Sequence, residues 1–115
     1  MAEDCIFCKI AKGEVPAEKI YEGENFFIIN DVNPVSEGHC LIISKEHYET
    51  IFDLPSEFGK ELIEVVQLHA KRLIDEGKAE GINIVNNVKE AAGQIVNHFH
   101  FHIVPRKKDD GLKIL

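Results

Sequence analysis

The pattern of apolar and polar positions divides the chain into a series of short strands interrupted by one helix. Period-two alternation and β-branched runs predict strands at residues 19–22, 25–30, 39–43, 82–85 and 98–104. The first two are separated by Gly23 and predict a hairpin with a tight turn. The last strand is expected to end at Pro105, which cannot donate a backbone hydrogen bond.

Two segments have the spacing of helices instead. Between Pro55 and Glu76, apolar residues recur every three or four positions with charged residues between them, which predicts one long amphipathic helix. Pro55 suits its first turn, and Gly77 its C-terminal stop. The apolar stretch Cys5–Ala11 predicts a short N-terminal helix. The fold class expected is therefore α+β: a five-stranded antiparallel sheet with the long helix packed on one face.

Length and composition indicate a single domain. The chain has 115 residues, of which 44% are hydrophobic and 29% charged, as is usual for one compact domain spanning residues 1–115. At this size roughly two-thirds of the surface of the unfolded chain can be buried, so neither a disulfide nor a structural metal is required for folding.

The charge balance narrows the classes of partner. Thirteen Lys and Arg stand against twenty Asp and Glu, a formal net charge of −7, which repels a phosphate backbone or an anionic membrane surface. No stretch approaches the roughly 18 consecutive apolar residues of a membrane span. Residues 1–4 are acidic where a signal peptide is basic and then apolar. We therefore expect a cytoplasmic protein with neither a nucleic acid nor a membrane as partner.

The segment 98–104 carries the strongest chemical signal. Its alternation puts His98, His100 and His102 on one face of the sheet, roughly 6.5–7 Å apart, because a strand rises about 3.3 Å per residue. Imidazole titrates near neutrality and its neutral form is nucleophilic, so the row supplies an attacking nitrogen and a proton donor for phosphoryl or nucleotidyl transfer. Two alternatives remain open. One is a polar edge strand without function. The other is a metal site, although the side chains of one flat strand diverge too far for all three histidines to bind one ion and only two of them can.

Residues just upstream of this strand suit a phosphate group. The pair Gly93–Gln94 offers a side-chain amide and accessible backbone N–H groups, and Asn87 offers another neutral donor. A Gly-Gln pair alone is a weak signal, and it gains weight beside the histidine row.

The cysteines suggest a second chemistry. Cys5 and Cys8 form a C-x-x-C pair, and Cys40 makes the count odd, so metal or redox chemistry is favoured over a disulfide framework. The alternative is two buried thiols that pack with their apolar neighbours.

Residues 93–105 resemble the His-φ-His-φ-His-φ-φ signature of the histidine triad (HIT) family, where φ is an apolar residue. Segments 5–10, 30–34, 38–43 and 45–47 resemble other landmarks of the family in the same order, closest to the Hint-type, or protein kinase C inhibitor-like, branch. The resemblance implies a HIT-like fold and a homodimer with sheets joined edge to edge and long helices in contact. The apolar row Leu62, Val66 and Leu73 is expected to support that contact.

The resemblance also implies roles for individual residues. His100 would be the nucleophile that carries the nucleotidyl group, His102 would contact the phosphate or protonate the leaving group, and His39 would be a further active-site histidine. Asp31 would hold the ribose, and Asn87, Gly93 and Gln94 would lie at the phosphate and leaving group. The residues expected to enclose the base are Ile6, Phe7, Ile10, Ile29 and Val32. The resemblance also implies that catalysis requires no cofactor.

Two further features, a set of four residues that match zinc ligands and the residue at position 95, add detail to this expectation. Some bacterial members bind a structural zinc ion through residues that match Cys5, Cys8, His47 and His98. After Gly-Gln the family usually has Ser or Thr, whose hydroxyl contacts the phosphate, whereas this chain has Ile95. Loss of that contact, about 1 kcal/mol, is expected to slow the reaction several-fold.

The leading functional hypothesis is hydrolysis of purine nucleoside phosphoramidates to nucleoside monophosphates through a nucleotidyl-His100 intermediate. One alternative is a dinucleoside polyphosphate hydrolase. Its anionic leaving group has to be stabilised by nearby positive charge, and the sequence offers little, because Arg106 is the only arginine near the histidine strand. Another is a nucleotide-binding interaction module with incidental hydrolysis.

Overall fold

The computed structural model describes residues 4–114 and contains one five-stranded sheet. The strands are β1 (Tyr21–Glu22), β2 (Phe26–Asn30), β3 (Cys40–Ser44), β4 (Gly81–Val85) and β5 (His100–Arg106). Their order across the sheet is β1-β2-β3-β5-β4, and every neighbouring pair is antiparallel. The expected α+β class, with its antiparallel sheet, is confirmed.

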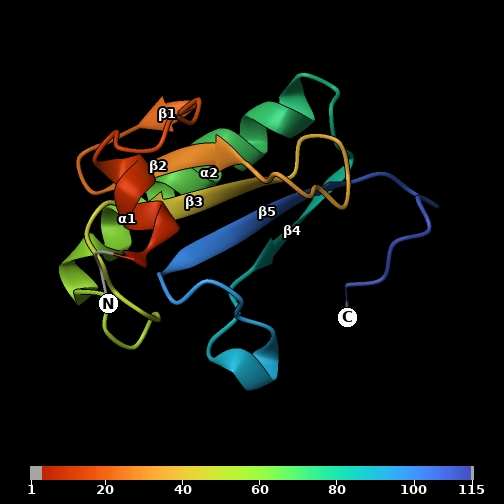
Figure 1. The fold of residues 1–115 in the computed structure, drawn as a ribbon. Helices are drawn as coiled ribbons and strands as arrows, with labels where there is room; N and C mark the ends of the chain where they lie inside the picture. Colours follow the sequence, from red (N-terminus) through yellow and green to blue (C-terminus); the bar gives the residue numbers. More distant parts are fainter. Residues whose placement is uncertain (1–3, 115) are drawn as a thin grey trace.

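The two helices cover opposite faces of this sheet. The short helix α1 (Ile6–Ala11) packs over β2 and β3, and the long helix α2 (Gly59–Asp75) lies behind the strands (Figure 1). A 3₁₀ turn at Ser56–Phe58 precedes α2, so Pro55 stands before that turn rather than in the first turn of the helix. Gly77 follows the end of α2 with φ +74°, a left-handed conformation that favours glycine.

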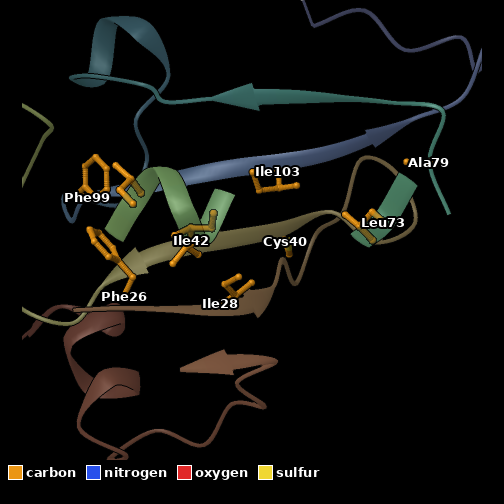
Figure 2. Close-up of a cluster of buried hydrophobic side chains, with 10 residues drawn as sticks. Phe26, Ile28, Cys40, Ile42, Leu73, Ala79, Phe99 and Ile103 are labelled. Atoms are coloured by element: carbon orange, nitrogen blue, oxygen red, sulfur yellow. The ribbon is translucent and has the colours of Figure 1, made fainter. Parts of the chain in front are cut away.

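Both faces of β2 and β3 are buried, each in a different cluster. Alternate residues on one face pack with Leu62, Val65 and Leu73 of α2, and those on the other pack with Phe7 and Ile10 of α1. The α2 side of these strands consists of Phe26, Ile28, Cys40 and Ile42 (Figure 2), and the α1 side of Phe27, Ile29, Leu41 and Ile43. Two buried faces explain why these segments are apolar at nearly every position.

The outer face of α2 corrects one expectation. Leu62 and Leu73 are buried in the chain's own core, and Val66 packs against the same core. Leu62 and Leu73 therefore cannot supply the expected contact surface, and Val66 is only partly accessible. The exposed large apolar residues of α2 are instead Ile63, Leu68 and Ile74.

The end of β5 also differs from the expectation, because the strand continues through Pro105 to Arg106. Pairing with β3 ends at Ile103, while pairing with β4 continues to Arg106. The Pro105 carbonyl accepts a hydrogen bond from the Ser36 hydroxyl at 2.8 Å. The backbone polar groups of Pro105 therefore point away from β4, toward the side of β5 where β3 has already ended. The missing N–H of proline therefore costs no ladder hydrogen bond here.

Within the part of the chain that the structure describes, no helix has both the length and the apolar character that crossing a bilayer requires.

Candidate active site

A cavity of about 420 Å³ opens on the α1 side of the sheet and collects most of the residues singled out in the sequence. Its lining has an apolar part and a polar part. The apolar part includes Ile6, Phe7, Ile10, Ile29, Val32 and Leu41, and the polar part includes Asp31, Asn87, Gly93, His100 and His102. An apolar slot joined to a few convergent polar groups is the usual form of a small-molecule site.

His100 lies in this cavity with one ring nitrogen already engaged. Its Nδ1 is 2.7 Å from the carbonyl oxygen of His98, which can only accept a hydrogen bond, so Nδ1 carries the proton. Burial is the main cause of a pKa below the ordinary value for this imidazole. The neutral ring therefore keeps a lone pair on Nε2, the form that a nucleophilic histidine needs.

His102 is held by His39, which lies behind it. The backbone N–H of Val35 donates to Nδ1 of His39 at 3.1 Å, which places the proton of neutral His39 on Nε2. That Nε2 is 3.0 Å from Nδ1 of His102 and 3.4 Å from Oδ2 of Asp31. His102 thus accepts at Nδ1 and carries its own proton on Nε2. His39 is buried and does not line the cavity, whereas His102 does.

The spacing and charge of the histidines differ from the sequence expectation. The ring centroids of His100 and His102 are 5.1 Å apart, closer than strand geometry alone gives, because the rings incline toward each other. Burial, together with smaller effects of the neighbouring His100 and His39, lowers the pKa of His102 to about 4. The imidazoles of His39, His100 and His102 are therefore neutral at pH 7 in the free protein, and an imidazolium ion requires the charge of a bound anion.

Asp31 is placed where β2 ends. Its Oδ1 accepts the backbone N–H of Asn33 at 2.8 Å, which fixes the carboxylate at the cavity wall. No Lys or Arg side chain is among the residues lining the cavity in the described part of the chain.

Gln94 has a different surrounding from the one expected. It is buried and absent from the cavity lining. Its side-chain oxygen accepts the backbone N–H of Lys89 at 2.8 Å, and its amide nitrogen donates to the Glu49 carbonyl at 2.7 Å. Gln94 therefore shapes the loop that presents Gly93, which has φ +98°.

Four lining residues were not expected from the sequence: Asn30, Asn33, Leu41 and Val96. Leu41 lies on the same face as Ile29 opposite it, so strand alternation and pairing could have identified it. Val96 follows an irregular loop and has no periodic signal.

The four predicted metal ligands come together next to this cavity. Ligand atoms of Cys5, Cys8, His47 and His98 all lie within 4.8 Å of one another. Nδ1 of His98 is 3.3 Å from Cys5 Sγ, 3.5 Å from Cys8 Sγ and 3.2 Å from His47 Nδ1. The remaining contact, from Cys8 Sγ to His47 Nδ1, is 3.2 Å.

The hydrogen bonds around this cluster fit a zinc ion. Nε2 of His98 donates to the Ser44 carbonyl at 2.7 Å, so its Nδ1 lone pair faces the thiols. Burial raises the pKa of Cys8 to about 11, which means that a cation is needed to make its thiolate stable here. Two thiolates and two imidazoles around one point form a closed tetrahedral zinc set.

Asp31, His39 and His102 form another group with close ligand atoms. The Val35 hydrogen bond keeps a proton on His39 Nε2, the atom that would have to bind the metal. This group therefore fits a hydrogen-bonded relay better than a metal site.

Comparison with known proteins agrees with this geometry. The family model described as "HIT domain" matches residues 12–109. The chain is 42% identical over 111 residues to "Protein hit" of Bacillus subtilis, covering 96% of this chain and 77% of the relative. It is 38% identical to "Adenosine 5'-monophosphoramidase HNT1" of Candida albicans, and the match covers 91% of this chain and 72% of that relative.

A solved structure shows the same architecture. The zinc-bound histidine triad family protein of Mycobacterium smegmatis superimposes with a TM-score of 0.90 at 39% identity, covering 99% of this chain and 83% of that one. With the family model spanning most of the chain, and with relatives at this level of identity, the protein belongs to the HIT family.

Proposed function

We propose that this protein hydrolyses purine nucleoside phosphoramidates, releasing a nucleoside monophosphate and an amine, through a nucleotidyl-His100 intermediate. The observation that carries the proposal is the orientation of His100, whose Nδ1–H is held by the His98 carbonyl and whose Nε2 lone pair is free in the cavity. The relative from Candida albicans, named as a monophosphoramidase, supports a hydrolase of this class.

The first half-reaction transfers the nucleotidyl group to the protein. Nε2 of His100 attacks the α-phosphorus, a P–N bond to the ring forms, and the P–N bond to the leaving amine breaks. The amine leaves with a proton from Nε2 of His102, which donates as an imidazolium ion and becomes neutral imidazole. The negative phosphate raises the proton affinity of the buried imidazoles, so that they gain positive charge when substrate is bound.

The second half-reaction regenerates the enzyme. A water molecule attacks the phosphorus and gives its proton to His102, and the bond to His100 Nε2 breaks. Neither half-reaction needs a metal or an organic cofactor, because the nucleophile and the proton carrier both belong to β5.

The nucleoside is recognised by the rest of the cavity. The Asp31 carboxylate accepts hydrogen bonds from the ribose hydroxyls, and the apolar slot formed around Phe7, Ile10 and Ile29 encloses the base. A purine buries more surface in this slot than a pyrimidine, so we expect purines to be preferred.

The positions of the arginines argue against the dinucleoside polyphosphate alternative. A polyphosphate leaving group requires positive charge nearby. The Arg106 guanidinium instead donates two hydrogen bonds to the Asp110 carboxylate, from Nε at 2.8 Å and from Nη2 at 2.7 Å. It donates a third, from Nη1 to the side-chain oxygen of Asn83, at 2.7 Å. It does not line the cavity.

The test is a steady-state comparison of adenosine phosphoramidate with diadenosine polyphosphates, using one preparation of the protein. We expect kcat/KM to be at least about tenfold higher for the phosphoramidate, a difference of about 1.4 kcal/mol in transition-state binding. A cytidine phosphoramidate serves as the matched control for the base. Equal or reversed preference between the two leaving groups would favour the polyphosphate hydrolase, and AMP binding without any turnover would favour the interaction module.

We also propose that Cys5, Cys8, His47 and His98 hold one structural zinc ion. Such an ion, when bound, would link parts of the chain and would not take part in catalysis, because four protein ligands leave no coordination position for water or substrate. It would tie the residues before α1 to the start of β5. Elemental analysis of protein purified without added metal should give about one zinc per chain, and Cys8→Ser should lower that content.

A further inference from the structure

The helix α1 lies between the metal-binding cluster and the nucleotide cavity. Cys5 and Cys8 direct their sulfur atoms into the cluster. Phe7 and Ile10 line the cavity. The helix has six residues, too few to be stable on its own, so its position depends on what holds it against the sheet.

Phe7 contacts both sites directly. Its ring meets the ring of His98 edge to face, with 5.7 Å between centroids, and that of His100 in the same way at 5.2 Å. One buried aromatic ring thus touches a ligand of the cluster and the proposed nucleophile, and it forms part of the wall around the base. A shift of α1 must move this wall.

His98 provides a second link between the two sites. Its side chain belongs to the cluster through Nδ1, while its backbone carbonyl accepts the Nδ1–H of His100 at 2.7 Å. The Ser44 carbonyl holds the other ring nitrogen at 2.7 Å. Fixing the His98 ring therefore also fixes the group that orients His100.

We infer that Cys5, Cys8 and His47 are positioning residues for the nucleotide, and that zinc and a purine nucleotide strengthen each other's binding through α1. This inference rests on the proposed function, because it requires the cavity to bind a nucleotide. Linkage makes the effect reciprocal: if zinc increases the affinity for AMP by some factor, AMP increases the affinity for zinc by the same factor.

Two affinities measured on the full chain test the inference. The Kd of AMP, the non-hydrolysable product, is measured by calorimetry on zinc-loaded and zinc-stripped protein. The Kd of zinc is measured by competition with a chromogenic chelator, with and without saturating AMP. We expect each affinity to rise about tenfold in the presence of the other ligand, a factor within the usual range for coupled sites. If each Kd changes by less than about twofold when the other ligand is present, the inference is overturned.

A pair of variants separates coupling through α1 from a general effect of zinc on folding. Phe7→Leu removes the ring that joins the two sites, and Val32→Ala removes a cavity residue that is 88% exposed and lies outside α1. We expect the coupling factor to fall in Phe7→Leu and to persist in Val32→Ala, although both variants bind AMP more weakly. The zinc affinities are compared at an AMP concentration set to the same multiple of each variant's Kd. If the coupling factor is then the same in Phe7→Leu as in Val32→Ala, zinc acts only through global stability, and the inference is contradicted.

The outcomes also distinguish this inference from the proposed function. If zinc-loaded protein binds no AMP, the nucleotide site itself is wrong, and the inference falls with it. If AMP binds equally well with and without zinc, and the phosphoramidate is still cleaved, then only the coupling is wrong. If the stripped chain does not take up zinc again, the positioning role of the thiols is contradicted.

Discussion

His39 Nε2 lies 3.0 Å from Nδ1 of His102, and the backbone N–H of Val35 fixes the direction of that hydrogen bond. Because Val35 donates to His39, His39 must donate to His102. His102 then carries its proton on Nε2, the nitrogen available to a leaving group. A buried histidine outside the cavity thereby sets the tautomer of one inside it.

Replacing His39 should therefore impair proton transfer more than binding. We expect His39→Phe to lower kcat about tenfold or more, because proton transfer by a positioned group contributes about 10²–10⁴ to the rate and orientation is a part of that. The Kd of AMP should change little. His39→Gln, which keeps an N–H donor, should recover part of the loss. Steady-state kinetics and calorimetry on both variants check this, and a loss of binding with kcat unchanged would show that His39 does not act through His102.

Acid should destabilise the fold through the buried histidines. In protein stripped of zinc, for which this prediction is made, burial lowers the pKa of His98 and of His102 to about 4, whereas an unfolded histidine titrates near 6.5. Below pH 6.5 the unfolded chain binds protons that the folded chain does not, so the free energy of unfolding falls as pH decreases from 6.5 to about 4. Above pH 6.5 these two residues contribute no pH dependence.

The control for this prediction is His102→Asn, which removes one of the two sites. We expect its free energy of unfolding, measured with urea between pH 7 and 4.5, to fall less steeply than that of the parent. The difference in slope should approach about 1.4 kcal/mol per pH unit for one proton. Parallel pH profiles for parent and variant would mean that His102 titrates normally in the folded protein.

Ile95 offers a gain-of-function test. The family usually has Ser or Thr at this position, and the Ile95 side chain is 92% exposed at the cavity, so a smaller residue disturbs no core packing. We expect Ile95→Ser to raise kcat/KM for the phosphoramidate several-fold, because a hydroxyl contact with the phosphate contributes about 1 kcal/mol. Ile95→Ala is the matched control, since it removes the same bulk without adding the hydroxyl. An equal gain in both variants would assign the effect to bulk alone.

A homodimer is the expected assembly. β4 is an edge strand of the sheet, and Ile84 on it is half exposed, as are Ile63 and Leu68 on α2. A two-fold contact would cover both the open strand edge and these side chains. Light scattering at micromolar concentration should report twice the 13.0 kDa chain mass. Charged substitutions at Ile63 and Ile84 should shift the protein toward the monomer, and a parent that is already monomeric refutes this assembly.

Local patterns in the sequence were sufficient to predict the strands and the histidine row, whereas the residues around the base and the role of Asp31 came from the resemblance to the HIT family. Alternation in residues 98–104 places His100 and His102 on one face because that rule depends only on strand geometry. Pro105 was misleading, since the cost of its missing N–H depends on where the neighbouring strand ends. The pairing of β3 with β5 is a tertiary feature that no local pattern reveals.

The details that set the chemistry depend on contacts distant in the chain. The tautomer of His39 follows from a backbone N–H in a loop, and the lowered pKa of His102 follows from burial by surrounding elements. Gln94 shows the same limit: a Gly-Gln pair indicates a phosphate loop, but only the fold shows that this amide binds the Glu49 carbonyl. Residue type indicated the kind of site, and packing determined what each group does in it.

The most direct test of the account is detection of the covalent intermediate. Protein mixed with excess adenosine phosphoramidate is quenched within the first turnover at neutral pH, digested and examined by mass spectrometry. We predict one acid-labile adenylyl group on the peptide that contains His100. It should be present in His102→Asn and absent in His100→Asn, whose turnover should fall by a factor of about 10³ or more. An unmodified His100 during turnover, or a His100→Asn variant within about tenfold of the parent rate, would contradict it.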